Sequence, residues 1–166
     1  MHSVSTDDRM GKPGVLVLGI GNTLLSDEGI GVHVLRRLHD EYGDDAGIDF
    51  IDGGTLGFTL AAPIASAARL IVIDAAQLDA EPGTVRCFLD DDMDRFIGYA
   101  RRSAHEIGLT DLMHITCLTG SLPQPRALVG IQPAHTGLGE QPTPAVAAAL
   151  ETACAEVRRL IGVWQS

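Results

Sequence analysis

Acidic residues at the ends of predicted strands are the side chains most able to do chemistry in this chain. Glu28, Asp52 and Asp74 each follow a short aliphatic run that is typical of a buried strand. The carboxyl ends of parallel strands meet at one edge of a sheet. We therefore expect Glu28 and Asp74 to face a common crevice at that edge, where carboxylates are suited to hold a metal ion.

His105 is the candidate for a third ligand, because it falls in the first turn of a predicted helix. Ser103 and Glu106 around it have the spacing of a capping box. The positive end of the helix dipole disfavours imidazolium and keeps the ring neutral and able to bind metal. Two carboxylates and one imidazole leave coordination positions open, which suits a divalent cation shared with substrate or water rather than a closed structural zinc site.

Structural roles explain the same residues without chemistry, and the spacing leaves this alternative open. Acids at strand ends are often helix caps or Asx-turn residues, and this is the role that we predict for Asp27. A histidine in a first helical turn can simply satisfy a loop carbonyl. Surface or packing roles are predicted for four further histidines, His33, His39, His114 and His135.

Residues 19–24, with the sequence Gly-Ile-Gly-Asn-Thr-Leu, offer a rival interpretation as a dinucleotide-binding loop. The first two glycines fit that fingerprint, but Leu24 replaces the third. Glu28 would stand close to the bound pyrophosphate and repel it. The sequence has no Walker motif, and none of its serines stands in a G-x-S-x-G setting. Nucleotide binding is the weaker interpretation.

Strands and helices alternate along the chain in a way that would position these residues. We predict strands at 15–20, 48–51, 70–73, 84–89 and 127–131, and helices at 28–42, 58–67, 103–120 and from 144 to the C-terminus. Asp27 or Ser26 is the predicted cap of the first helix and Thr143 that of the last, while residues 90–102 are predicted to form a loop with at most a helical turn.

The order of these elements predicts an α/β fold. The first three strands, each joined to the next by a helix, are typical of a parallel sheet. About ten residues separate the third strand from the fourth, whereas a parallel crossover needs a dozen or more. We therefore predict a three-layer α/β/α sandwich with a five-stranded mixed sheet, mostly parallel, whose fourth strand is antiparallel.

The composition bounds the class of protein. Its 166 residues suit one domain, predicted to span 14–166 after a disordered N-terminal extension, 1–13. The formal net charge of −10 argues against nucleic acid or an anionic membrane as partner, although it also serves solubility. With no membrane-length apolar run and no secretory signal, we expect a cytoplasmic protein. Three cysteines without CxxC spacing suggest neither disulfides nor a zinc site, and Cys117 and Cys154 are predicted on helical core faces.

Five segments of the chain resemble motifs of a known family. They are Gly19–Val32, Asp52–Thr55, Ile73–Ala75, Ser103–Leu109 and Leu128–Pro133. In type and order they resemble the nickel–iron hydrogenase maturation endopeptidases over nearly the whole chain after Pro13. The segments around His105 and Gly130 look most like the branch that serves uptake hydrogenases. Residues 134–142 do not align with the family.

This resemblance implies a fold and a function. The fold is an α/β/α sandwich with an antiparallel fourth strand, in agreement with the loop-length argument. The function is removal of a short C-terminal extension from a nickel–iron hydrogenase large-subunit precursor after nickel insertion. The family's metal ligands carry over onto Glu28, Asp74 and His105, and its Asp-Gly-Gly-Thr aspartate carries over onto Asp52, whose role the resemblance does not specify.

The resemblance also implies a mechanism and partners. The three ligands would engage nickel that the precursor already holds, so we expect a monomer without a tightly bound metal of its own. Nickel would polarise the scissile carbonyl while water attacks, with Asp52 or another carboxylate accepting the proton. Two alternatives remain: a non-proteolytic metal-binding chaperone that uses the same ligands, and, with less support, a nucleotide-binding module.

Overall fold

The computed structural model describes residues 14–44, 47–54, 58–99, 104–118 and 122–166, without the side chains at 58, 99 and 104–108. The predicted N-terminal extension, 1–13, lies outside these ranges. The strands are β1 (Val15–Ile20), β2 (Ile48–Gly54), β3 (Leu70–Ala75), β4 (Val85–Leu89) and β5 (Arg126–Ile131). The helices are α1 (Ile30–Tyr42), α2 (Ala61–Ser66), α3 (Asp90–Tyr99), α4 (Ala104–Leu118) and α5 (Pro144–Gln165), with 3-10 helices η2 (Ser26–Gly29) and η3 (Phe58–Leu60).

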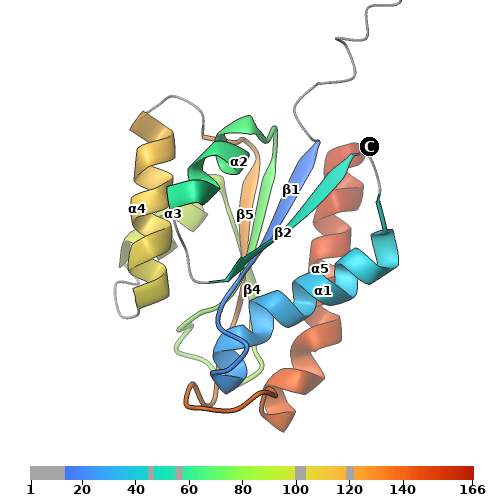
Figure 1. Ribbon diagram of the computed structural model, residues 1–166, viewed down its shortest axis with the longest axis vertical. Coiled ribbons are helices and arrows are strands. Elements are labelled where there is room, and N and C mark those ends of the chain that lie inside the picture. The colour runs from blue at the N-terminus through green and yellow to red at the C-terminus, as the bar shows by residue number, and fades with distance from the viewer. Residues whose placement is uncertain (1–13, 45–46, 55–57, 100–103, 119–121) are drawn as a thin grey trace, which may run out of the picture.

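The strands form one mixed sheet in the order β2-β1-β3-β5-β4. Strand β1 pairs in parallel with β2 and β3, β3 pairs in parallel with β5, and β4 runs antiparallel to β5. Figure 1 shows the sheet between two helical layers, with α1 and α5 on one side and α2, α3 and α4 on the other. The predicted three-layer fold and the antiparallel fourth strand are confirmed.

Strand β1 shows why the central strands are recognisable in the sequence. Val15 and Val17 pack toward α1 and α5, while Leu16 and Leu18 pack toward α2, α3 and α4. All four side chains are at most 1% exposed, so the strand is buried on both faces. A strand that is covered on both faces needs apolar residues at every position rather than at alternate ones.

Two strands extend past their predicted ends, and both extensions carry candidate site residues. Strand β2 was predicted to end at Ile51 but continues to Gly54. Strand β3 was predicted to end at Ile73 but continues to Ala75. Asp52 and Asp74 therefore lie within paired strands rather than in the loops that follow them, and the pleat of the sheet fixes the face that each side chain occupies.

The prediction of a loop at 90–102 is wrong, because α3 occupies most of this segment. Met93 and Ile97, four residues apart, are buried under the sheet. Three aspartates in the first turn favour a helix N-terminus. The buried Arg126 of β5 donates two hydrogen bonds, of 3.0 and 2.5 Å, to the Asp94 carboxylate. Because so few residues face the core, the run of charges conceals the helical period.

The cysteine predictions are half right. Cys154 is fully buried in α5, and burial raises the pKa of its thiol to about 11. Cys117 is exposed, so its predicted place in the core is wrong. It follows the core-facing Met113 by one helical turn, but there it lines a hollow beside α3 instead of meeting the sheet. In the described part of the chain, no helix has the length and hydrophobicity needed to cross a membrane.

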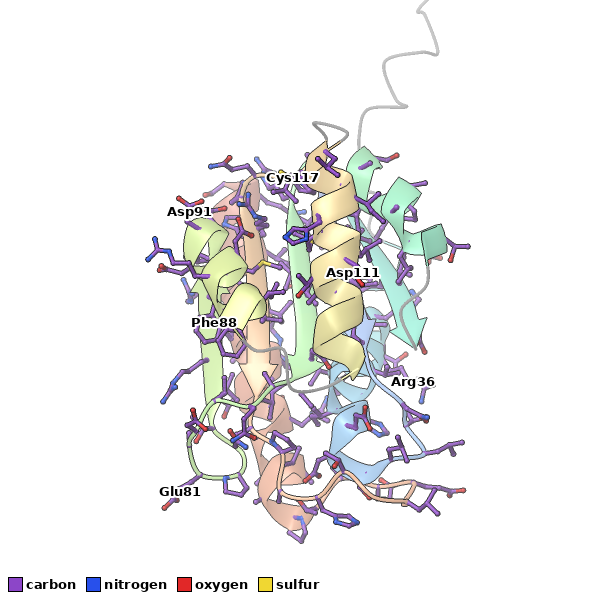
Figure 2. All side chains as sticks on the ribbon, turned by 90° about the vertical axis from the view of Figure 1, so that its left-hand side faces the viewer. Arg36, Glu81, Phe88, Asp91, Asp111 and Cys117 are labelled. Carbon is purple, nitrogen blue, oxygen red and sulfur yellow. The ribbon has the colours of Figure 1, made fainter. Side chains whose placement is uncertain are left out.

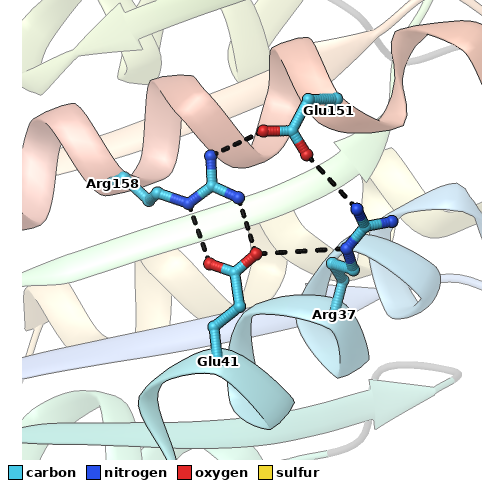
Figure 3. Close-up of polar contacts among 4 residues, drawn as sticks. All are labelled: Arg37, Glu41, Glu151 and Arg158. Atoms are coloured by element: carbon cyan, nitrogen blue, oxygen red, sulfur yellow. Dashed lines mark hydrogen bonds and ion pairs between the residues drawn. The ribbon is translucent and has the colours of Figure 1, made fainter.

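A network of ion pairs joins α1 to α5 on the surface (Figure 3). The Arg158 guanidinium of α5 donates to Glu41 of α1 at 2.8 and 2.6 Å, and to Glu151 at 2.8 Å. Arg37 of α1 lies 3.6 Å from Glu151 and 4.0 Å from Glu41. The hydrogen bonds from Arg158 hold the pKa of Glu41 and of Glu151 below the usual value.

We expect Arg158→Met to lower the melting temperature at low ionic strength, and added salt to shrink this loss because the groups are solvent-exposed. Glu41 and Glu151 have lowered pKa values in the folded state, so their contribution is present above about pH 4.5 and disappears as the pH falls through the folded-state values. Thermal denaturation across salt and pH measures both effects. Arg159→Met is the matched control, because Arg159 pairs with Glu156 of the same helix. A loss that is independent of salt would contradict the expectation.

Candidate functional site

Glycines in the segment that follows β1 allow its backbone to pack in direct contact with neighbouring backbone. A Cβ atom at Gly31 would lie 2.2 Å from the carbonyl oxygen of Ile73 and 2.5 Å from that of Ile20. At Gly21, where φ is +136°, a Cβ atom would lie 2.0 Å from the carbonyl oxygen of Glu28. These glycines let η2 and the start of α1 pack directly on the ends of β1 and β3.

The structure places Glu28 and Asp74 at the same edge of the sheet. Glu28 is half-buried in η2, which packs against β3, and Asp74 is 3% exposed near the carboxyl end of β3. Strands β1 and β3 are parallel neighbours, as the prediction required. The carboxyl edge of the sheet therefore carries two of the three predicted ligands.

The third predicted ligand, His105, is located by its backbone. Helix α4 begins at Ala104, so His105 falls in the first helical turn as predicted. Its side chain, and the predicted cap Ser103, lie outside the described residues. Figure 2 shows α4 running from the end of the molecule that carries Arg36 toward the end that carries Cys117, so its first turn lies at the carboxyl edge of the parallel strands. Among the side chains that the structure describes, no three His, Cys, Asp or Glu residues form a metal-binding group.

Asp52 and Asp74 lie on different faces of the sheet. Gly19 of β1 aligns with Asp52 of β2 on one side and with Ile73 of β3 on the other. The Asp52 and Asp74 backbones are therefore about two strand spacings, roughly 10 Å, apart. Side chains alternate along a strand, so Asp74 is on the face of α4, whereas Asp52 is on the face of α1.

Asp52 faces a cation that the sequence analysis missed. Its Oδ2 lies 3.6 Å from the guanidinium of Arg36 on α1, and its Oδ1 accepts a hydrogen bond of 2.9 Å from the N–H of Gly54. Both side chains line an open hollow of about 320 Å³, together with Gly21, Asn22, Thr23, Val32 and Gly54. Arg36 follows Val32, which also lines the hollow, by four residues, so the two side chains share one face of α1.

The predicted capping role of Asp27 is wrong. Within the described residues, α1 has no side-chain cap, and the Asp27 side chain is fully buried. Its Oδ2 accepts hydrogen bonds from the N–H groups of Ala134 (2.8 Å) and His135 (3.0 Å). The N–H of Thr143 donates to Oδ1 at 2.6 Å, and the Thr143 hydroxyl donates to the same carboxylate. Thr143 is the N-cap residue of α5 as predicted, but its hydroxyl binds Asp27.

The electrostatics of Asp27 follow from these contacts. Burial raises the pKa of the carboxyl group, but the backbone hydrogen bonds from His135, Thr143 and Ala134 outweigh it, so the pKa lies below the usual value. The carboxylate is therefore a buried anion that four donor groups on one distant segment stabilise.

Backbone pairing holds the same two segments together. The N–H of Ser26 donates to the carbonyl of Gly139 at 2.8 Å, and the N–H of Gly139 donates to the carbonyl of Leu24 at 2.9 Å. The Ser26 hydroxyl adds a bond of 2.9 Å to the carbonyl of Gly137. Residues 134–142 are thus held against residues 24–27, the segment that leads directly into Glu28.

Comparisons with known proteins agree with this fold. A family model described as hydrogenase maturation protease matches residues 32–159. The chain is 41% identical over 123 residues to the hydrogenase expression/formation protein HupM of Azotobacter chroococcum mcd 1, over 74% of this chain and 59% of that protein. It is 38% identical over 151 residues to HupD of Rhodobacter capsulatus, over 90% of this chain and 72% of that protein.

A solved structure is similar as well. The hydrogenase maturating endopeptidase HybD from E. coli superimposes with a TM-score of 0.81 at 34% identity, over 86% of this chain and 88% of that one. The chain spans less than two thirds of the length of the first curated relatives that it matches, 59% and 60%.

We expect Asp27→Asn to lower the free energy of unfolding at neutral pH by about 2–3 kcal/mol, because an amide accepts through one oxygen only and leaves buried donors unpaired. The folded-state pKa of Asp27 is lowered, so its contribution is present above about pH 3.8 and is lost as the pH falls further. Urea denaturation at neutral and acidic pH measures the difference. Asp40→Asn, at an exposed position of α1, is the control. Equal stability of Asp27→Asn and the wild type at neutral pH would contradict the assignment.

Proposed function

Because this chain belongs to the hydrogenase maturation protease family, we propose that it is an endopeptidase that removes the C-terminal extension from the precursor of a nickel–iron hydrogenase large subunit. The observation that supports this most directly is the pair of carboxylates at the carboxyl edge of the sheet. Glu28 and the nearly buried Asp74 lie there, at the same end of the molecule as the first turn of α4, which contains His105. Enzymes with open α/β sheets bind their ligands in this position.

We propose that Glu28, Asp74 and His105 recognise nickel that arrives bound to the precursor. Carboxylate and imidazole donors suit a borderline divalent ion. Asp74 is only 3% exposed, and attraction between opposite charges is stronger where water is largely excluded. Cleavage would then depend on nickel insertion, and the purified protein would carry no tightly bound metal of its own, which metal analysis of the protein can check.

In the proposed reaction, a water molecule adds to the scissile carbonyl carbon while the substrate's nickel polarises the carbonyl oxygen. A carboxylate takes the proton from the water, and the same proton passes to the departing amide nitrogen. Glu28 and Asp74 are better placed for this step than Asp52, which lies on the other face of the sheet beside Arg36. We propose that Asp52 and Arg36 instead bind the substrate chain in the hollow that they line.

The packing of the glycine segment weighs against nucleotide binding. In a phosphate loop, the space above the glycines is left open for the ligand. Here the carbonyl of Glu28 fills that space at Gly21, and the backbone of Thr23 fills it at Gly29. A metal-binding chaperone would use the same three ligands, and only the product distinguishes it from a protease.

We expect the wild-type protein to shorten nickel-loaded precursor and to leave nickel-free precursor intact, as read from the precursor mass. Glu28→Gln, Asp74→Asn and His105→Ala should fold and should slow the cleavage at least about 100-fold. Asp40→Asn, at an exposed position of α1, should cleave like the wild type. Nickel binding without any change of precursor mass would support the chaperone, and full processing by the three variants would overturn the site assignment.

Asp52→Asn separates substrate binding from proton transfer. The amide oxygen can still accept the hydrogen bond from Gly54, so the strand end should stay intact. We expect KM for the precursor to rise about tenfold with kcat nearly unchanged, because one charge-assisted contact is lost. Asp49→Asn, an exposed position on the same strand, is the matched control. A fall in kcat of about 100-fold or more would instead make Asp52 the proton acceptor.

A further inference from the structure

Two leucines are exposed at the edge of the sheet that carries the candidate site. Leu24, between β1 and η2, is 59% exposed, and Leu138, between β5 and α5, is 87% exposed. Single exposed leucines are common on protein surfaces, but adjoining ones form an apolar patch that indicates an interaction site. The question is therefore whether these two side chains adjoin.

The backbone pairing places them side by side. Leu25 and Gly139 form a parallel bridge, made by the bonds from the Gly139 N–H to Leu24 and from the Ser26 N–H to Gly139. Leu24 and Leu138 each precede the bridged residue of their own segment. The backbones of Leu24 and Leu138 are therefore neighbours, and both side chains are exposed. We call these two neighbouring exposed residues the leucine pair, and they make up one apolar patch.

The surroundings hold the leucine pair in place. Asp27, three residues after Leu24, binds the segment that contains Leu138 through buried hydrogen bonds. A Cβ atom at Gly139 would lie 2.5 Å from the hydroxyl oxygen of Ser26, so the two segments are in tight contact. A partner that buries the leucine pair therefore loses little affinity to ordering of the backbone.

The leucine pair lies on the two segments that lead to and hold the start of the candidate site. Leu24 lies four residues before Glu28, and Leu138 belongs to residues 134–142, which bind residues 24–27. Among residues 21–26 and 132–143, all of which the structure describes, Glu140 is the one with a formal charge at neutral pH, histidine being counted as neutral. The patch thus favours an apolar partner surface rather than a basic one.

We propose that the leucine pair is a docking surface for the hydrogenase large-subunit precursor and contacts apolar residues beside its C-terminal extension. This inference rests on the proposed function and adds a contact that selects the folded precursor independently of its metal. Such a contact binds substrate and transition state equally, so it lowers KM without raising kcat.

The test compares the double variant Leu24→Ser/Leu138→Ser with the wild type on nickel-loaded precursor. We expect KM to rise about tenfold or more with kcat unchanged, since two leucine side chains lose their buried area. Leu118→Ser is the matched control: Leu118 is also 87% exposed, but it follows Cys117 at the opposite end of the molecule (Figure 2). It should keep the wild-type KM.

The outcomes separate the two proposals. Cleavage by the double variant with an unchanged KM would overturn the docking surface and leave the proposed function standing. Failure of the wild type to shorten nickel-loaded precursor would overturn the proposed function, and the docking surface with it. Sedimentation of the wild type and the double variant tests whether a second copy of this chain binds the leucine pair instead. A wild-type dimer that becomes monomeric in the double variant would make the leucine pair a self-association surface and overturn the proposal.

Discussion

The buried carboxylate of Asp27 is the constraint on which the site end of this molecule depends. A carboxylate without access to water is stable only if hydrogen bonds replace its hydration. Among the residues that the structure describes, the donors that do so come from Ala134, His135 and Thr143. The segment before α5 therefore cannot separate from the segment after β1 without breaking the hydrogen bonds that stabilise this charge. Because Glu28 directly follows Asp27, the same hydrogen bonds also fix the position of the Glu28 backbone.

A steric constraint acts beside the electrostatic one. Gly21 and Gly31 allow backbone-to-backbone contacts that any side chain would prevent. The spacing of Gly19 and Gly21 imitates a nucleotide fingerprint because both kinds of loop need a tight turn from a strand into a helix. The difference lies in what occupies the space above the glycines, a phosphate in one case and the protein's own carbonyls in the other. The spacing of the glycines therefore predicts the tight turn but not whether a phosphate or the protein's own backbone fills the space.

The same distinction explains which features the sequence could predict. Local signals sufficed for β1, whose burial on both faces requires an unbroken apolar run, and for β4, whose direction follows from a short connection. Long-range contacts leave no local signal in the sequence, so the local pattern predicts a cap at Asp27 although its partners lie more than 100 residues away. The face of the sheet on which Asp52 lies follows from the alternation of Ile48 and Phe50. That alternation can be extended to Asp52 only when the strand is known to continue to Gly54.

Because Asp74 and Asp52 lie on opposite faces of the sheet, each can recognise a different part of the substrate. Strand β1 runs between β3 and β2, and the segment that leaves it passes over the edge. On our proposal, nickel is read on the face of Asp74 and the polypeptide on the face of Asp52. A precursor in a productive position would then straddle the end of β1, where Glu28 and the leucine pair are both held by Asp27. Metal, peptide and protein surface would each contribute a separate part of the binding energy, so a precursor that lacks nickel would lose one part only. Selectivity for the loaded form must then come from the chemical step, in which the metal polarises the carbonyl, rather than from affinity alone.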